Sequence, residues 1–154
     1  MQLSPHFTLE EATFSETATR LGIVNIPNEQ QKQNMIFAAQ KLEHVRSLLK
    51  YPLKINSWFR TEKVNSAIGG AKSSSHLDGH AIDFSCSGFG SPHAVCIYLS
   101  QQKIEWDQVI LEYNQWTHIS FDPKNRKQLL TIFNPQKIYA LGIWSKDEYT
   151  KKIV

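Results

Sequence analysis

Hydrophobic positions in the first third of the chain recur every three to four residues, which is the period of an amphipathic helix. A first helix is expected over residues 9–21. Thr8 followed three residues later by Glu11 forms a capping-box pattern, and Gly22 is a natural stop. A longer helix is expected over residues 29–50, where the same spacing continues. The pattern therefore predicts a helical N-terminal third.

After residue 52 the period changes to two, which is typical of strands. Strands are expected over residues 53–59, 81–86, 107–112 and 116–121. Shorter helices are expected over residues 61–68 and 91–102. Helices thus precede most strands, which favours the α+β class, with N-terminal helices packed on a small antiparallel sheet. We expect a single domain over residues 1–154, with its core in 3–121 and a C-terminal packing segment and tail in 122–154.

Composition narrows the class of protein. The chain has 154 residues, of which 41% are hydrophobic, enough for the core of one domain. It has no apolar run of membrane-spanning length, so we expect no stable membrane insertion. It has no visible secretory signal, so we expect it to be cytoplasmic at synthesis. We also expect a monomer. Seventeen basic residues against fourteen acidic ones are too balanced to indicate nucleic-acid binding. Cys86 and Cys96 allow one disulfide at most, and Cys86 is expected to face the core.

Candidate chemistry gathers in two segments. In the first, a Ser-rich loop enters a predicted strand and places His76 and Asp83 seven residues apart around Gly79. The second is the predicted strand 116–121, which carries His118. Two imidazoles and one carboxylate from separate segments make a three-ligand set, and catalytic zinc takes three protein ligands. The sequence therefore predicts a zinc site.

Three segments carry a wider pattern: Ser74-x-His76-x-x-Gly79-x-Ala81-x-Asp83 followed by Trp116-x-His118; Ser57-Trp58-Phe59-Arg60 with Asn65 and Gly69-Gly70; and the opening Ser4-Pro5-His6-Phe7-Thr8-Leu9-Glu10-Glu11. This pattern resembles that of the zinc D-Ala-D-Ala carboxypeptidases and the related phage L-Ala-D-Glu endolysin peptidases. The opening is similar to that of their compact phage and bacterial subgroup. The resemblance covers most of the chain.

The resemblance implies that zinc is bound by His76, Asp83 and His118. It also implies that Arg60 and Ser74 contact the substrate, a peptidoglycan stem peptide cut at a bond that involves a D-amino acid. A planar guanidinium suits a peptide carboxylate, which agrees with that role for Arg60. Such an enzyme would reach the cell wall through a holin or inside a virion.

One position departs from the family pattern. These peptidases usually carry an acidic general base three residues before the last histidine, and here that position is Gln115, which cannot take a proton. The departure also suits an alternative function, a catalytically inactive zinc-containing module that binds the wall or forms part of a virion. A second alternative, a binder of nucleic acid or membrane surfaces through the basic tail at Lys151-Lys152, is disfavoured by the balanced charge.

Glu112 is a substitute base if residues 113–115 form a three-residue hairpin loop. In that register Glu112 pairs with Trp116 and lies diagonal to His118 on one face, about 7–8 Å away. A two-residue loop would turn Glu112 to the opposite face and leave it an exposed strand-end carboxylate. We therefore predict the longer loop and Glu112 as the catalytic base.

Two residues inside the motif receive a plainer interpretation. His80 does not stand at a ligand position, and we expect it to line the pocket or to be exposed rather than to act as a fourth ligand. Asp78 is expected to be a turn residue before Gly79.

Overall fold

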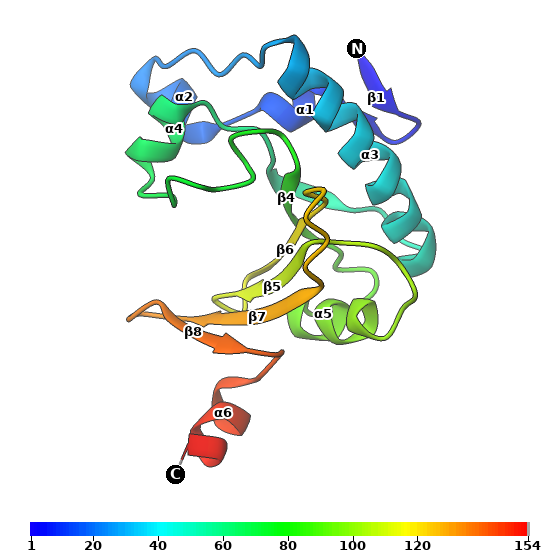
Figure 1. Ribbon diagram of the computed structural model, residues 1–154, viewed down its shortest axis with the longest axis vertical. Helices are drawn as coiled ribbons and strands as arrows, with labels where there is room; N and C mark the ends of the chain where they lie inside the picture. The colour runs from blue at the N-terminus through cyan, green and yellow to red at the C-terminus, as the bar shows by residue number, and fades with distance from the viewer. Residues whose placement is uncertain (154) are drawn as a thin grey trace.

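The computed structural model describes residues 1–153. Figure 1 shows the N-terminal helices at one end of the molecule, with a broad sheet below them. The helices are α1 (Leu9–Thr13), α2 (Glu16–Leu21), α3 (Glu29–Leu49), α4 (Glu62–Ala67), α5 (Pro92–Ser100) and α6 (Lys146–Ile153). The strands are β1 (Gln2–Ser4), β2 (Phe7–Thr8), β3 (Lys54–Ser57), β4 (Ala81–Ser85), β5 (Gln108–Glu112), β6 (Trp116–Ser120), β7 (Gln128–Phe133) and β8 (Ile138–Leu141). The α+β class is confirmed.

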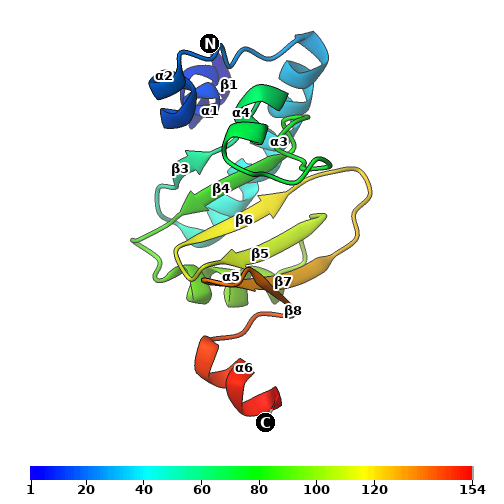
Figure 2. The same cartoon turned by 90° about the vertical axis from the view of Figure 1, so that its left-hand side faces the viewer.

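The main sheet has six strands in the order β3-β4-β6-β5-β7-β8 (Figure 2). It is mixed rather than wholly antiparallel, because β7 runs parallel to β5 while the other neighbours are antiparallel. The connection after β6 explains the difference. Ser120 at the end of β6 and Gln128 at the start of β7 both pair with Gln108 at the start of β5. The chain crosses from β6 to β7 at the end of the sheet where β5 begins, so β7 runs parallel to β5.

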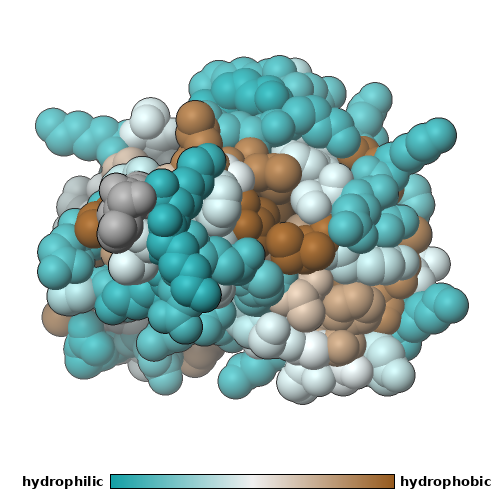
Figure 3. Space-filling view, turned by 90° about the horizontal axis from the view of Figure 1, so that it is seen from below, coloured by the Kyte–Doolittle hydropathy of each residue, from teal (hydrophilic) through white to brown (hydrophobic). Residues whose placement is uncertain are grey.

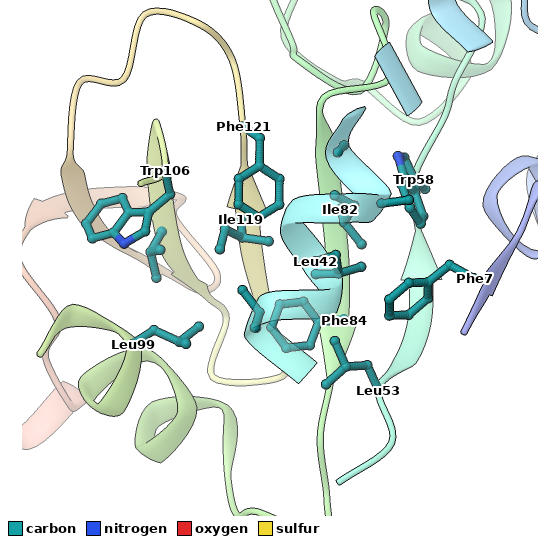
Figure 4. Close-up of a cluster of buried hydrophobic side chains, with 14 of the residues drawn as sticks. Phe7, Leu42, Leu53, Trp58, Ile82, Phe84, Leu99, Trp106, Ile119 and Phe121 are labelled. Atoms are coloured by element: carbon teal, nitrogen blue, oxygen red, sulfur yellow. The ribbon is translucent and has the colours of Figure 1, made fainter. Parts of the chain in front are cut away.

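Side-chain alternation along the central strands separates two faces of the sheet. One face presents Ile82, Val109 and Ile119, which are fully buried. They join one apolar cluster with buried residues of α3 and α5, such as Leu42 and Leu99 (Figure 4). Because both helices cover this face, the polar residues at the intervening strand positions are left on the other face.

The predicted helix 9–21 is two helices. The Thr8–Glu11 capping box and the left-handed Gly22 are both present, as expected. Between them the backbone of Phe14 is extended, and the hydroxyl of Ser15 accepts a hydrogen bond from the backbone of α2. Ser15 therefore starts a new helix, an N-cap that the apolar spacing concealed.

The C-terminal segment is more regular than a packing segment and tail. It forms β7, β8 and α6, with Lys151 and Lys152 in the last turn of α6, whereas Val154 lies outside the described residues. Residues 129–133 are apolar apart from Thr131 and have no period of two, which hid the strand. Seen from the end that carries α6, the surface is mostly hydrophilic with a small apolar area (Figure 3). No helix within residues 1–153 has the length and apolar character to cross a membrane.

Candidate metal centre

The polar face of the sheet brings together residues from neighbouring strands. Asp83 on β4 pairs directly with His118 on β6. On the other side of β6, Ile110 pairs with His118 and Glu112 pairs with Trp116. The predicted three-residue hairpin register is thereby confirmed. Because alternation sends Asp83, His118 and Glu112 to the face away from the helices, their carboxylates and imidazole converge.

His76 reaches the same point from the loop before β4, and that loop is fixed against α3. The side chains of Gln31 and Asn34 donate hydrogen bonds to the backbone carbonyls of Leu77 and Asp78, at 3.1 and 2.9 Å. Gly79 has φ +89°, and a Cβ there would lie 2.6 Å from a side-chain carbon of α3. Only glycine fits this left-handed position pressed against the helix.

The ring of His76 is held in one orientation. Its Nδ1 donates a 2.6 Å hydrogen bond to the carbonyl oxygen of Trp58. Its Nε2 is buried without a hydrogen-bond partner and lies 3.3 Å from Oδ2 of Asp83. The other carboxylate oxygen, Oδ1, lies 2.8 Å from Nδ1 of His118. Candidate ligand atoms of the three residues all lie within 4.8 Å of one another.

These residues fit a zinc ion. Two imidazole nitrogens and one carboxylate are a ligand set that zinc accepts, with room for a further ligand. The Trp58 carbonyl fixes the His76 tautomer whose Nε2 carries a lone pair, as an outer hydrogen bond does for metal-bound histidines. That buried lone pair has no protein partner, and an ion between the three side chains would satisfy it.

For Asp83 and His76, the electrostatics favour the protonation states that bind metal. Burial would raise the pKa of Asp83, but interactions with His76 and His118 outweigh burial and hold it far below its ordinary value. Burial lowers the pKa of His76, against the opposing effect of Asp83. An ionised carboxylate and a neutral imidazole are the forms that coordinate a metal. For His118, burial is outweighed by the hydrogen bond to Asp83 and by its charge, which raise the pKa.

Glu112 lies beside this group. Its Oε1 is 3.5 Å from Nδ1 of His118, and its side chain is 17% exposed, so it is not a freely solvated strand end. Burial first, and the charge of Asp83 second, raise the pKa of Glu112 to about 7, against opposing effects of His118, Arg60 and Lys137. Its carboxyl group is therefore poised to exchange a proton near neutral pH.

Arg60 and Ser74 both lie beside His76. The guanidinium of Arg60 is 4.0 Å from Asp83 and donates a 3.0 Å hydrogen bond to Asn65, while its buried Nε has no partner. A Cβ at Gly70 would overlap Oδ1 of Asn65, so glycine permits this packing. The hydroxyl of Ser74 accepts a hydrogen bond from the backbone of His76 and braces the loop.

A single cleft, called here the central cleft, joins these residues. Its walls include Arg60, Ser74, His76, Asp83, Glu112 and His118. Lys137 and Tyr139, from the β7–β8 hairpin and its turn, also line it. Their contribution was not predicted, because nothing in the sequence pattern indicated that the C-terminal segment returns to the site.

His80 corrects the sequence interpretation. It is buried, with 8% of its surface exposed, and it is not among the residues of the central cleft. It lies just before β4, and its ring makes a T-shaped contact with that of Phe37. Asp78 is the expected turn residue, since its Oδ1 accepts a hydrogen bond from the backbone of His80. Cys86 is buried in the core, as expected.

Comparison of the sequence with known proteins identifies its family. A family model described as Peptidase M15 matches residues 5–120, a range that contains every residue of the candidate metal centre. No curated protein matches the sequence significantly. M15 peptidases are metallopeptidases, and the buried His76, Asp83 and His118 supply a candidate metal site of the kind such an enzyme needs. The chain therefore belongs to the M15 peptidase family.

Proposed function

We propose that the protein is a zinc-dependent peptidase that cleaves peptidoglycan stem peptides at a bond involving a D-amino acid. The bond is of the D-Ala-D-Ala carboxypeptidase or the L-Ala-D-Glu endopeptidase type. The observation that carries the proposal is the buried ligand set of His76, Asp83 and His118 with Glu112 on the same face of the sheet. Membership of the M15 family supports it.

In the proposed mechanism His76 Nε2, Asp83 and His118 Nδ1 would hold the metal. Zinc, when bound, supplies Lewis-acid polarisation of the scissile carbonyl and a lowered pKa for attacking water. Glu112 takes a proton from the water and returns it to the leaving amine, which its raised pKa allows near neutral pH. Asp83 stays ionised throughout, because its pKa lies far below that range.

Arg60 is proposed to bind a substrate carboxylate. Its guanidinium lines the central cleft, and its buried Nε has no hydrogen-bond partner in the protein. A planar donor fork of this kind pairs with a carboxylate. Lys137, which lies outside the range that matches the family, adds a further positive charge to the cleft. The charge in the cleft thus suits an acidic peptide, as stem peptides are.

The exposed Gln115 favours a second candidate function, an inactive zinc-containing module that binds the wall. Gln115 does not line the central cleft, and it cannot act as a base. The two candidates differ in whether Glu112 replaces it.

Mass spectrometry of purified peptidoglycan, incubated with zinc-loaded protein with and without a chelator, separates the candidates. The proposed enzyme releases stem-peptide fragments whose masses identify the bond, and the chelator abolishes them. Zinc-loaded protein that binds peptidoglycan but releases no fragment would contradict the enzyme and favour the module.

A further inference from the structure

A second cluster of potential metal ligands lies where β4 begins and the neighbouring strand β6 ends, outside the central cleft. It consists of Asp78, His80 and Asp122, whose candidate ligand atoms all lie within 4.8 Å of one another. The topology explains how they meet. Ala81 at the start of β4 pairs with Ser120 at the end of β6, so the residues just before β4 lie beside those just after β6.

The imidazole of His80 is the feature that indicates a ligand. Its side chain is 10% exposed, and its Nδ1 is buried without a hydrogen-bond partner. That nitrogen lies 3.1 Å from Oδ1 of Asp78, yet not in the orientation of a hydrogen bond. Two ligands of one zinc ion, each about 2.0–2.2 Å from it, lie about 3–4 Å apart without sharing a proton. A buried nitrogen without a hydrogen-bond partner destabilises the fold, and an ion bound there would satisfy it.

The two carboxylates are already oriented by the backbone. Oδ1 of Asp78 accepts a hydrogen bond from the backbone of His80 at 3.1 Å, and Oδ1 of Asp122 accepts one from the backbone of Lys124 at 3.0 Å. Each carboxylate therefore keeps its second oxygen for another partner. The backbone of Phe121 also donates to the carbonyl of His80 at 3.0 Å, which fixes the two segments together.

We propose that Asp78, His80 and Asp122 bind a divalent transition-metal ion at a structural site separate from the central cleft. One imidazole with two carboxylates suits zinc, cobalt, nickel or manganese, whereas calcium and magnesium prefer oxygen ligands alone. The ion would tie the segment before β4 to the end of β6. These two strands carry Asp83 and His118, so the second ion would stabilise the framework of the first site.

The test counts metal ions per chain. Wild type and variants are dialysed to equilibrium against zinc, and bound metal is measured by elemental analysis, with circular dichroism to verify folding. The proposal predicts two ions for wild type, one for His80→Gln and one for Asp83→Asn. The matched control, His44→Gln, removes an exposed histidine on α3 and is expected to keep two. His80→Gln is also expected to lose part of the rise in melting temperature that zinc produces.

Asp122→Asn provides a second variant at the partly exposed side of the cluster, in case His80→Gln does not fold. It is expected to bind one ion. A single ion in wild type that Asp83→Asn abolishes would overturn the proposal and leave His80 as part of an ion pair. Two ions that persist in both His80→Gln and Asp122→Asn would overturn it as well.

Discussion

At the scale of single residues, Glu112 and His118 share one face of the sheet because a three-residue loop joins their strands. Tyr113 and Asn114 both have φ +55°, the left-handed conformation that lets so short a loop reverse the chain. Burial in this position, rather than the residue type alone, gives Glu112 the raised pKa of a usable base.

The charge of Lys137 makes that pKa testable. A general base works when deprotonated, so cleavage is expected to fall as the pH drops through the pKa of Glu112, about 7 before a metal cation lowers it. Lys137 lowers the same pKa, so Lys137→Met is expected to shift the acid limb of the rate profile to higher pH. The profile of kcat/KM against pH measures the shift. The control is Lys103→Met, which changes an exposed lysine away from the cleft and should leave the acid limb in place. A shift of the acid limb to lower pH in Lys137→Met would refute the assignment of that limb to Glu112.

At the scale of elements, the crossing from β6 to β7 depends on one buried carboxylate. Asp107 is fully buried, and Arg126 donates to it from Nε at 2.9 Å, from Nη2 at 2.7 Å and from its backbone at 2.9 Å. Burial would raise the pKa of Asp107, but these hydrogen bonds outweigh it and lower the pKa. The Asp107–Arg126 pair therefore fixes the β6–β7 connection to the residue that precedes β5.

Removing this pair should destabilise the fold in a pH-dependent way. Arg126→Met is expected to lower the free energy of unfolding by about 1–3 kcal/mol, because it leaves part of a buried carboxylate unsatisfied. The folded pKa is depressed, so the stabilisation is present above the unfolded pKa, about 3.9, and is lost as the pH falls through the folded pKa. Urea unfolding at neutral and at low pH measures both effects. An equal loss in Arg20→Met, an exposed arginine on α2, would contradict the prediction.

Some elements could be predicted from the sequence because their signals are local. Helix α3 follows from its apolar spacing, and β4 and β6 follow from alternation and from the ligand spacing they carry. The break at Ser15 could not be predicted, because the helical spacing of apolar residues runs across it. The strand β7 could not be predicted either, because its mostly apolar segment has no period of two. The parallel pairing of β7 depends on contacts with β5 that no local pattern encodes.

At the scale of the whole molecule, α3 and α5 occupy one face of the sheet and leave the other for the central cleft (Figure 2). The three candidate metal ligands could be predicted because their spacing is a property of the sequence. Two surrounding features of the site could not be predicted: the hydrogen bond from His76 to the Trp58 carbonyl, and the position of Lys137 in the cleft wall. Both depend on segments that meet only in the folded chain.

The candidate metal ligands come from three segments: the loop before β4, β4 itself and β6. Metal binding is therefore expected to be coupled to global stability. Zinc at a free concentration 100 times the dissociation constant of one site is expected to add about 2.7 kcal/mol to the free energy of unfolding. A chelator should remove that increment, and Asp83→Asn should lose the contribution of the first site. Thermal unfolding with and without zinc measures it. An unchanged melting temperature of wild type in the two conditions would show that the folded chain does not bind the ion.

The most direct test of the central claim compares cleavage by zinc-loaded Glu112→Gln and Gln115→Glu with wild type on purified peptidoglycan. Glu112→Gln is expected to bind zinc as wild type does and to lose about 10²–10⁴-fold in rate, the contribution of a positioned base. Gln115→Glu, exposed on the loop and outside the cleft lining, should cleave at close to the wild-type rate. Wild-type cleavage by Glu112→Gln, or activity that first appears in Gln115→Glu, would contradict Glu112 as the base.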